Sequence, residues 1–174
     1  LNFALQAALN PPKPGKQERR FGELIFREGD RVMQTRNDYD VVWQKEDGTA
    51  GTGIFNGDVG KIAKIDPSGE LLEIVFDDRT ATYTSDMLAE LDMAYAMTVH
   101  KAQGSEYRGV VFVGAPCAPS LMVRGVLYTA ITRARELLVI VGDDSAVNKM
   151  AENDRRSRRY SGLKWRLRKG GEEK

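Results

Sequence analysis

The sequence contains two polar, charged clusters, Thr98-Val-His-Lys-Ala-Gln-Gly-Ser-Glu106 and Leu127-Tyr-Thr-Ala-Ile-Thr-Arg-Ala-Arg135. A short apolar run follows each cluster, at residues 109–113 and 137–141. Runs of this kind, bounded by Gly and polar residues, are typical of parallel strands that are covered on both faces. Ligands of parallel sheets collect at the ends of the strands, where loops carry the polar groups. We therefore predict an α/β layer with a charged working edge.

The segments around these clusters complete the predicted layer. Residues 93–97 are mostly apolar and are interpreted as a further strand that leads into the first cluster. Ser120 is expected to cap a helix with one apolar face, formed by Val123, Leu127, Ala130 and Ile131. Asp143 or Asp144 is expected to cap the last helix, because the chain has no phosphate loop that would make either one a magnesium ligand.

The N-terminal half has a different pattern. Apolar residues at helical spacing predict an amphipathic helix over residues 1–9, which the Pro-rich segment 10–15 ends. Residues 13–20 are polar, and we expect them to be mobile. Predicted strands and turns then alternate, with strands at 31–35, 61–65, 71–76 and 80–84 and turns at 56–57, 66–69 and 77–78.

This alternation predicts a small antiparallel barrel or sandwich that ends near Leu91. The polar, Gly-rich segment 41–53 interrupts it, and we expect this segment to be disordered or hairpin-like.

The composition limits the class of protein. With 174 residues and 41% hydrophobic content, the chain can form one ordinary domain, or one domain and a small second one. The formal net charge of +1 gives no general sign of a polyanionic partner, although basic residues crowd the segment 155–169. One cysteine excludes an internal disulfide and fits a reducing cytoplasm. No apolar run reaches membrane-spanning length, and a start at Leu1 inside a helical pattern predicts a piece of a longer protein.

Several polar motifs have more than one interpretation. Arg133 lies where a helix runs out toward a buried strand, so its guanidinium either contacts phosphate oxygens or is solvated or ion-paired. Thr98, His100, Lys101 and Gln103 supply donors at a strand end that suit phosphate contact. Residues 56–61 lack the spacing of a phosphate loop and are interpreted as a turn. His100 has no second His or Cys nearby, so no metal site is predicted.

The clusters resemble the motifs of a known family. Residues 98–106 look like motif V, and residues 127–135 like motif VI, of superfamily 1 helicases, and above all of RecD-like helicases, which include the alpha subunit of exodeoxyribonuclease V. Residues 1–11 resemble a helix late in the second motor domain of that family. Residues 29–39 and 55–60 resemble the entry to its inserted Src-homology-3-like barrel.

This resemblance covers nearly the whole chain, in the order of the family. It implies an α/β fold in which a RecA-like second motor domain, 2A, is formed by residues 1–28 and 92–150. An inserted Src-homology-3-like β-barrel, 2B, would occupy residues 29–91, and a basic C-terminal helix and tail would follow at 151–174. The chain departs from the family pattern at the insertion 40–54 and at Gly125, where the family usually has Asn.

The resemblance also implies roles for individual residues. Arg133 would be the catalytic arginine finger on the γ-phosphate of ATP. Gly104 and Glu106 would bind ATP, with the glutamate toward the ribose. Six residues would lie on the side of the DNA: Thr98, His100, Lys101, Asn37, Tyr39 and Asn56.

The function implied by the resemblance is that of the C-terminal part of an ATP-dependent DNA helicase of DNA repair and recombination, moving 5′ to 3′ in the cytoplasm. Its partners would be single-stranded DNA, an N-terminal motor domain and other exodeoxyribonuclease V subunits, with no membrane partner. ATP and Mg²⁺ would be required, but the phosphate loop and the Mg²⁺ ligands would lie upstream, so the chain alone is expected to be inactive. The alternative is a non-catalytic barrel module that binds nucleic acid or peptide.

Overall fold

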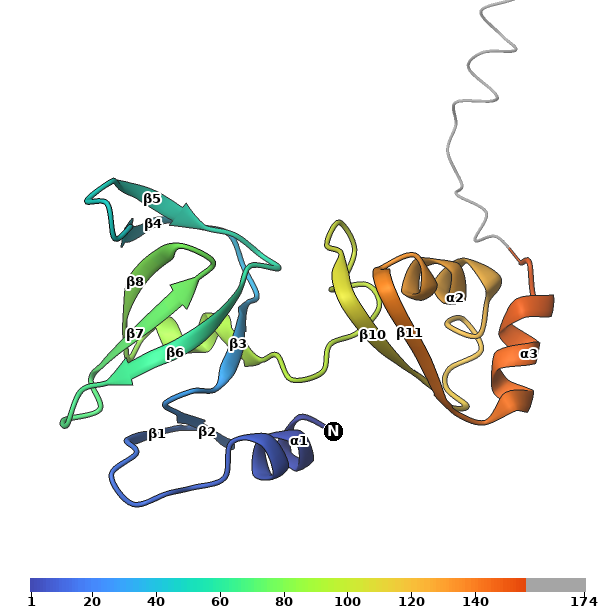
Figure 1. Cartoon of the computed structure of the whole chain (residues 1–174), viewed down its shortest axis with the longest axis horizontal. Helices are drawn as coiled ribbons and strands as arrows, with labels where there is room; N and C mark the ends of the chain where they lie inside the picture. The colour runs from blue at the N-terminus through green and yellow to red at the C-terminus, as the bar shows by residue number, and fades with distance from the viewer. Residues whose placement is uncertain (156–174) are drawn as a thin grey trace, which may run out of the picture. The chain divides into compact units, whose positions relative to one another are not determined.

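The structure is a computed structural model, and it describes residues 1–155 of the 174-residue chain. Its internal contacts divide the chain into two compact units, Leu1–Lys101 and Ala102–Lys174. We name them the antiparallel unit and the parallel unit after the sheets that they contain (Figure 1). Of the basic segment predicted over 151–174, the part from residue 156 onward lies outside the described residues.

The antiparallel unit, all of which is described, consists of one α-helix, one short 3-10 helix and nine strands. In chain order these are α1 (Asn2–Leu9), β1 (Glu18–Phe21), β2 (Leu24–Arg27), β3 (Arg31–Gln34), β4 (Asp38–Gln44), β5 (Ala50–Ile54), β6 (Val59–Ile65), β7 (Leu71–Phe76), β8 (Arg79–Thr84), η1 (Met87–Glu90) and β9 (Leu91–Met93). Seven strands form one sheet in the order β5-β4-β8-β7-β6-β3-β9, while β1 pairs with β2 in a separate hairpin. The predicted helix and antiparallel strands are confirmed.

The core of this unit lies on one face of the sheet, because buried and more exposed side chains alternate along β7 and β8. Ile62, Ile74 and Tyr83 are fully buried on that face, whereas the neighbouring Lys61 and Thr82 face outward. This is the alternation that the pleat of a strand imposes on successive side chains. Burying each large apolar side chain contributes about 1.5–3 kcal/mol, so the sheet is stabilised chiefly from one side.

The segment 41–53, which the sequence left open as disordered or hairpin-like, is ordered into the β4–β5 hairpin. Trp43 lies directly opposite Gly51, and the tryptophan ring fills the space above the glycine. A Cβ atom at Gly51 would approach the ring to 2.4 Å, so this position requires glycine. The ring also lies 5.9 Å from the guanidinium carbon of Arg79 in β8, which holds the hairpin onto the sheet.

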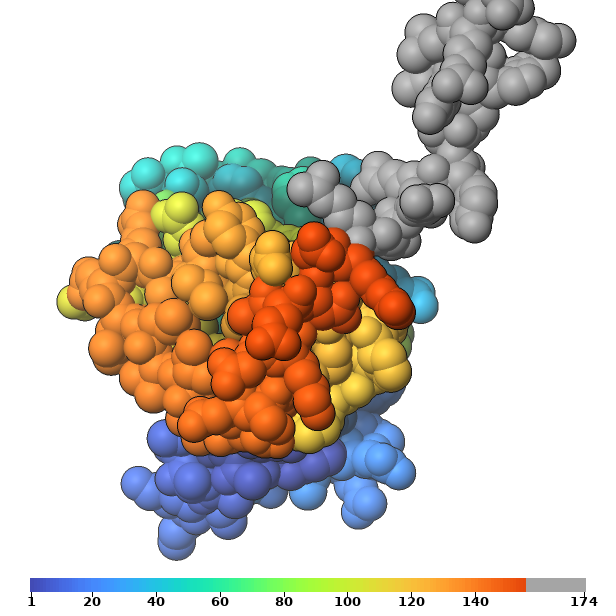
Figure 2. Space-filling view, turned by 90° about the vertical axis from the view of Figure 1, so that its right-hand side faces the viewer, coloured from blue at the N-terminus to red at the C-terminus, as the bar shows by residue number. Residues whose placement is uncertain are grey.

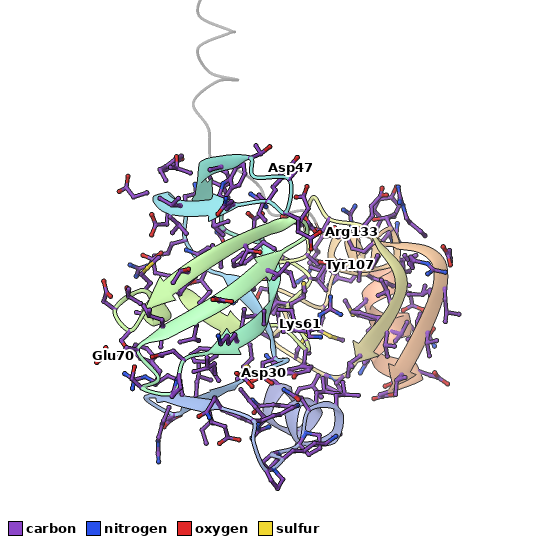
Figure 3. The ribbon with its side chains drawn as sticks, turned by 60° about the vertical axis from the view of Figure 1, so that its left-hand side comes forward. Asp30, Asp47, Lys61, Glu70, Tyr107 and Arg133 are labelled. Carbon is purple, nitrogen blue, oxygen red and sulfur yellow. The ribbon has the colours of Figure 1, made fainter. Side chains whose placement is uncertain are left out.

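The Asp30 carboxylate organises the N-terminal part of the antiparallel unit. It is fully buried and accepts hydrogen bonds from Gln6 Nε2 at 2.6 Å and from Asn10 Nδ2 at 2.7 Å, both near or in α1. The backbone N–H of Arg27 in β2 and the hydroxyl of Tyr95 donate to it as well, each at 2.7 Å. Figure 3 shows Asp30 between the sheet and the N-terminal elements. A buried charge of this kind is tolerated because all its neighbours are donors.

Two sequence predictions for this unit are wrong. Residues 18–20, expected to be mobile, form part of β1, because Arg19 donates to Ser85 Oγ at 2.9 Å and the strand pairs with β2. The strand expected at 93–97 as part of the parallel sheet is also absent. Only Leu91–Met93 forms a strand, and this strand pairs with β3 in the antiparallel sheet. The side chain of Asn2 in α1 forms hydrogen bonds with the backbone of Met93 and of Ala96.

The described part of the parallel unit consists of β10 (Tyr107–Gly114), α2 (Arg124–Ile131), β11 (Ala134–Gly142) and α3 (Asp144–Glu152). β10 and β11 pair in parallel, with Val110 opposite Leu138, which confirms the two predicted strands and their parallel direction. Both helices contact β10, and α2 also contacts α3 and β11. Figure 2 shows α3, in red, on the surface of this unit beside the orange residues that run from α2 to β11.

The expected burial on both faces is wrong for the described part of this unit. α2 and α3 bury only their own inward residues, Leu127, Ala130, Ala146 and Met150. Val111 in β10 is 65% exposed and Leu137 in β11 is 60% exposed. Nothing among residues 102–155 covers that apolar surface.

Ser120 does not cap α2, contrary to the prediction. The helix begins four residues later, at Arg124, and its first backbone N–H donates to the Asn153 carbonyl beyond α3 at 2.7 Å. Arg124 Nε in turn donates to the Ala151 carbonyl at the end of α3 at 2.6 Å. The start of α2 and the end of α3 thus satisfy each other's free backbone groups. The predicted cap at Asp143 is confirmed, and its hydrogen bonds from the hydroxyl and backbone of Ser145 lower the pKa of that carboxyl.

The contacts group residues 1–28 with the antiparallel sheet, and the chain divides after Lys101. The assignment of residues 1–28 and 92–150 to one motor domain stays a prediction. Among the described residues, no helix is long and apolar enough to span a membrane.

Replacing Asp30 by Asn is expected to destabilise the antiparallel unit by about 2–3 kcal/mol, because an amide presents a donor where four donors already converge. Urea unfolding followed by tryptophan fluorescence in a Trp165→Phe background, which leaves Trp43 as the reporter, measures this change. Asp47→Asn, in an exposed turn, is the matched control and should leave the unfolding midpoint nearly unchanged. Equal unfolding midpoints for both variants would show that Asp30 does not hold the unit together.

Tyr95 should make the unit sensitive to high pH. Burial, followed by the hydrogen bond to Asp30, raises the pKa of Tyr95 from 10.0 to about 12. The unfolded chain therefore loses this proton at lower pH than the folded chain, so the contribution of Tyr95 is complete below pH 10 and declines as the pH rises toward 12. Tyr95→Phe should lower stability at pH 7 yet lose less stability than wild type between pH 10 and 12. Parallel alkaline limbs for the two proteins in urea titrations would contradict this assignment.

Candidate functional site

The Arg133 guanidinium is positioned at the junction between α2 and β11. Its Nη1 donates to the Ser105 carbonyl at 2.8 Å, and its Nε donates to the Thr129 carbonyl, one helical turn earlier, at 3.2 Å. Its Nη2 lies 3.4 Å from the Thr132 hydroxyl. Figure 3 shows Arg133 next to Tyr107, the first residue of β10. The side chain is therefore half-buried and held by parts of both clusters.

All the acceptors around Arg133 are neutral. A guanidinium has five N–H donors, and the three bonds above leave two of them unused. Within residues 1–155 no carboxylate forms an ion pair with Arg133, whereas the nearby Arg135 and Arg108 are both paired with glutamates. The arrangement orients Arg133 while leaving its charge available to an anion.

The loop at residues 104–107 is bound to the start of β11. The backbone N–H of Tyr107 donates to the Arg133 carbonyl at 2.8 Å, and Glu106 Oε2 lies 2.7 Å from Arg135 Nε. Gly104 begins this loop with a φ of +88°, a conformation that L side chains rarely adopt. The structure thus brings together the three residues predicted for the nucleotide: Gly104, Glu106 and Arg133.

Thr98, His100 and Lys101, the first three predicted DNA residues, belong to the antiparallel unit and follow β9 in a series of turns. The Thr98 hydroxyl accepts from the backbone N–H of Lys101 at 3.3 Å, and both Thr98 and His100 are exposed. The Lys101 ammonium lies 3.0 Å from Asp92, so part of its charge is already compensated. Thr98 and His100 are therefore the better placed for a phosphate.

The other three predicted DNA residues lie together where β4 begins and β5 ends. The backbone N–H of Asn56 donates to Asn37 Oδ1 at 3.0 Å. The exposed ring of Tyr39 meets Phe55 edge to face, with ring centroids 5.5 Å apart. We call these four residues the Tyr39–Phe55 cluster. Phe55 was not predicted, although an aromatic residue directly before an Asn-Gly turn is a signal that could have identified it.

An acidic cavity of about 610 Å³ opens beside this cluster, on the outer side of β4 and β8. Its walls include three carboxylates and the exposed Val42, in the set Asp38, Asp40, Val41, Val42, Gln44, Glu73, Thr80, Thr82 and Met87. Carboxylates repel phosphate, so a nucleic acid at the Tyr39–Phe55 cluster would have to avoid this cavity and use the rings and amides instead.

Comparison with known proteins identifies two regions of the chain that match helicase families. Residues 1–76 match the family described as the ATP-dependent RecD-like DNA helicase SH3 domain, and residues 93–141 match the UvrD-like helicase C-terminal domain. The chain is a homologue of the RecD-like helicases. It carries an SH3-like antiparallel sheet followed by the small parallel strand and helix region of a helicase C-terminal domain.

Two similar RecD-like proteins are much longer than this chain. The ATP-dependent RecD2 DNA helicase of Deinococcus radiodurans is 37% identical over 158 residues, which are 91% of this chain and 20% of that protein. The RecBCD enzyme subunit RecD of Mycolicibacterium smegmatis is 32% identical over 143 residues, 82% of this chain and 23% of that protein. The chain thus spans about a fifth of the length of these relatives.

The RecD-like segment also contains residues that the sequence did not single out for a role. Arg135 pairs with Glu106, and the Ser105 carbonyl holds Arg133. Arg124 donates to the Ala151 carbonyl and so closes the end of α3. The partners of Arg135 and Arg133 depend on where β10 and β11 start relative to each other, and no short sequence motif specifies that. Among residues 1–155 no three His, Cys, Asp or Glu side chains gather to hold a metal ion.

Proposed function

We propose that this chain is the C-terminal part of an ATP-dependent DNA helicase of RecD type, which moves 5′ to 3′ along single-stranded DNA in DNA repair and recombination in the cytoplasm. Arg133 is the arginine finger on the γ-phosphate of ATP, and Gly104 and Glu106 contact the nucleotide. The observation that carries this proposal is the setting of Arg133, which is oriented by neutral acceptors and has no carboxylate partner among residues 1–155.

The chemistry requires this setting. A finger stabilises charge that develops on the transferred phosphoryl group, so it must be held rigidly and must not be neutralised beforehand. A carbonyl orients the guanidinium without cancelling its charge, whereas an ion pair like that of Arg108 with Glu136 would compete with the phosphate.

The exposed apolar surface of β10 and β11 supports the RecA-like part of the proposal. Parallel sheets are normally buried on both faces, so two strands with Val111 and Leu137 uncovered fit one portion of a wider sheet. We propose that the rest of domain 2A and the N-terminal motor domain belong to the parent protein. The phosphate loop and the Mg²⁺ ligands would lie there, so the 174 residues alone neither hydrolyse ATP nor unwind DNA.

DNA contact is assigned to two places. Thr98 and His100 face the backbone of the strand, with Lys101 a weaker contact because of Asp92. The Tyr39–Phe55 cluster offers an exposed ring on which a base can stack, flanked by the amides of Asn37 and Asn56. The acidic cavity favours a second candidate function, in which this barrel binds a basic peptide, such as a segment of another subunit of a nuclease complex.

Arg133→Ala in the complete protein is expected to lower ATPase turnover about a thousandfold or more, because the transition-state charge loses its finger. Binding of single-stranded DNA should persist. Arg108→Ala, which removes an exposed arginine already paired with Glu136 in the same sheet, is the control and should leave turnover nearly unchanged. Near-normal turnover of the Arg133 variant in steady-state assays would refute the finger assignment.

Tyr39→Ala is expected to weaken binding of an oligothymidine by about 1–3 kcal/mol, the range observed for the loss of one base–aromatic stack. Fluorescence anisotropy at several salt concentrations separates this stacking loss from charge effects, which change with salt. The matched control is Tyr128→Ala, which removes an equally exposed ring from α2. Unchanged affinity for the Tyr39 variant, together with binding of a Lys-rich peptide that Asp40→Asn abolishes, would favour the peptide-binding alternative.

A further inference from the structure

Glu106 and Arg135 form an ion pair next to the loop that holds Arg133. Glu106 Oε2 accepts from Arg135 Nε at 2.7 Å, and within residues 1–155 its other oxygen, Oε1, accepts no hydrogen bond. Both side chains are more than half exposed. The pair lies where β10 and β11 begin. There Tyr107 is opposite Ala134, and the backbone N–H of Tyr107 donates to the Arg133 carbonyl.

We infer that Arg135 is a positioning residue for nucleotide sugar recognition: it holds the Glu106 carboxylate by one oxygen, so that the other accepts hydrogen bonds from the sugar hydroxyls of the bound nucleoside triphosphate. The inference rests on the proposed function, in which Glu106 lies toward the ribose. It adds the group that orients Glu106 and the part of the substrate that the pair distinguishes.

The hydrogen bond from Arg135 limits the conformations of the Glu106 side chain. A glutamate that precedes a strand has freely rotating side-chain torsions, and fixing them on binding costs free energy. Arg135 is the second residue of β11 and lies between Ala134 and Leu137, which both pair with β10, so its backbone is held on either side and its Nε lies within hydrogen-bond distance of Glu106. A carboxylate anchored through Oε2 presents Oε1 to hydroxyl donors without further ordering.

The positive charge of Arg135 also compensates the negative charge of Glu106. An unpaired carboxylate near a triphosphate would repel it, whereas one neutralised by Arg135 keeps its acceptor oxygens and loses most of that repulsion. Because the pair is exposed, it contributes little to folding stability. Its loss should therefore change substrate recognition without unfolding the unit.

The same two strands contain a matched pair. Arg108 donates to Glu136 through Nε at 3.0 Å and through Nη2 at 3.1 Å, and both side chains are exposed. It has the same charges and joins β10 to β11, but it uses both glutamate oxygens. Arg108→Gln is therefore the control for a merely structural effect.

The test is steady-state ATPase of the complete protein with ATP and with 2′,3′-dideoxy-ATP. For Arg135→Gln, KM for ATP should rise about tenfold, equal to about 1.4 kcal/mol, while kcat stays within about threefold. The preference for ATP over the dideoxy nucleotide should largely disappear. Arg135→Lys should recover part of it, and Arg108→Gln should behave as wild type. In a Glu106→Gln background, Arg135→Gln should have no further effect on KM.

Several outcomes would overturn the inference. One is an unchanged ATP preference in Arg135→Gln. Another is an equal rise in KM for both nucleotides that persists in the Glu106→Gln background, because Arg135 would then contact phosphate directly. A third is a fall in melting temperature and activity matched by Arg108→Gln. The Arg133→Ala variant distinguishes failure of the proposed function itself. If Arg133→Ala hydrolyses ATP at a normal rate, the proposed nucleotide site is wrong. If Arg133→Ala is inactive but Arg135→Gln behaves as wild type, only the sugar-recognition role is wrong.

Discussion

The antiparallel unit depends on one buried carboxylate. Asp30 has no exposed surface, and its oxygens accept four hydrogen bonds from residues that are far apart in the sequence, from Gln6 in α1 to Tyr95 after β9. Removing a charge from water is costly, so this arrangement is stable only while all the donors are in place. The same requirement fixes where α1, the β1–β2 hairpin and the segment after β9 lie against the sheet. The chain that leaves this segment carries Thr98 and His100 a few residues later.

A different principle organises the parallel unit. There the strand ends are joined by hydrogen bonds to backbone carbonyls and by two exposed ion pairs, rather than by a buried charge. The Arg133 side chain and the Arg133 carbonyl bind Ser105 and Tyr107 respectively, so the loop of the first cluster cannot move independently of the arginine in the second. Hydrogen bonds thus join two motifs that are separated by more than twenty residues.

Much of this organisation was predictable from local patterns. The alternation in β6 to β8, the turn at Asn56-Gly57 and the apolar runs of β10 and β11 depend on neighbouring residues, and the structure agrees with them. The failures share a cause, which is that long-range partners replaced local ones. Asn153 supplies the acceptor at the start of α2 in place of Ser120, and β3 recruits residues 91–93 away from the parallel sheet.

The site shows the same limit. The roles of Arg133, Glu106 and Gly104 were assigned because the segments that resemble motifs V and VI contain these residues, and the roles stay predictions. The contacts of Arg135 and Phe55 depend on neighbours that only the fold provides. The insertion 40–54 was ambiguous because the effect of Gly51 depends on Trp43 lying above it. In each case a residue type is uninformative until its cross-strand partner is known.

The most direct test of this account is a structure of the complete protein with Mg²⁺, ADP and aluminium fluoride, which stands in for the transferred phosphoryl group. The account predicts that the Arg133 guanidinium donates to the fluoride at about 3 Å while its Nε remains on the Thr129 carbonyl. A complex in which Arg133 stays bound to Ser105 and makes no contact with the fluoride would contradict it.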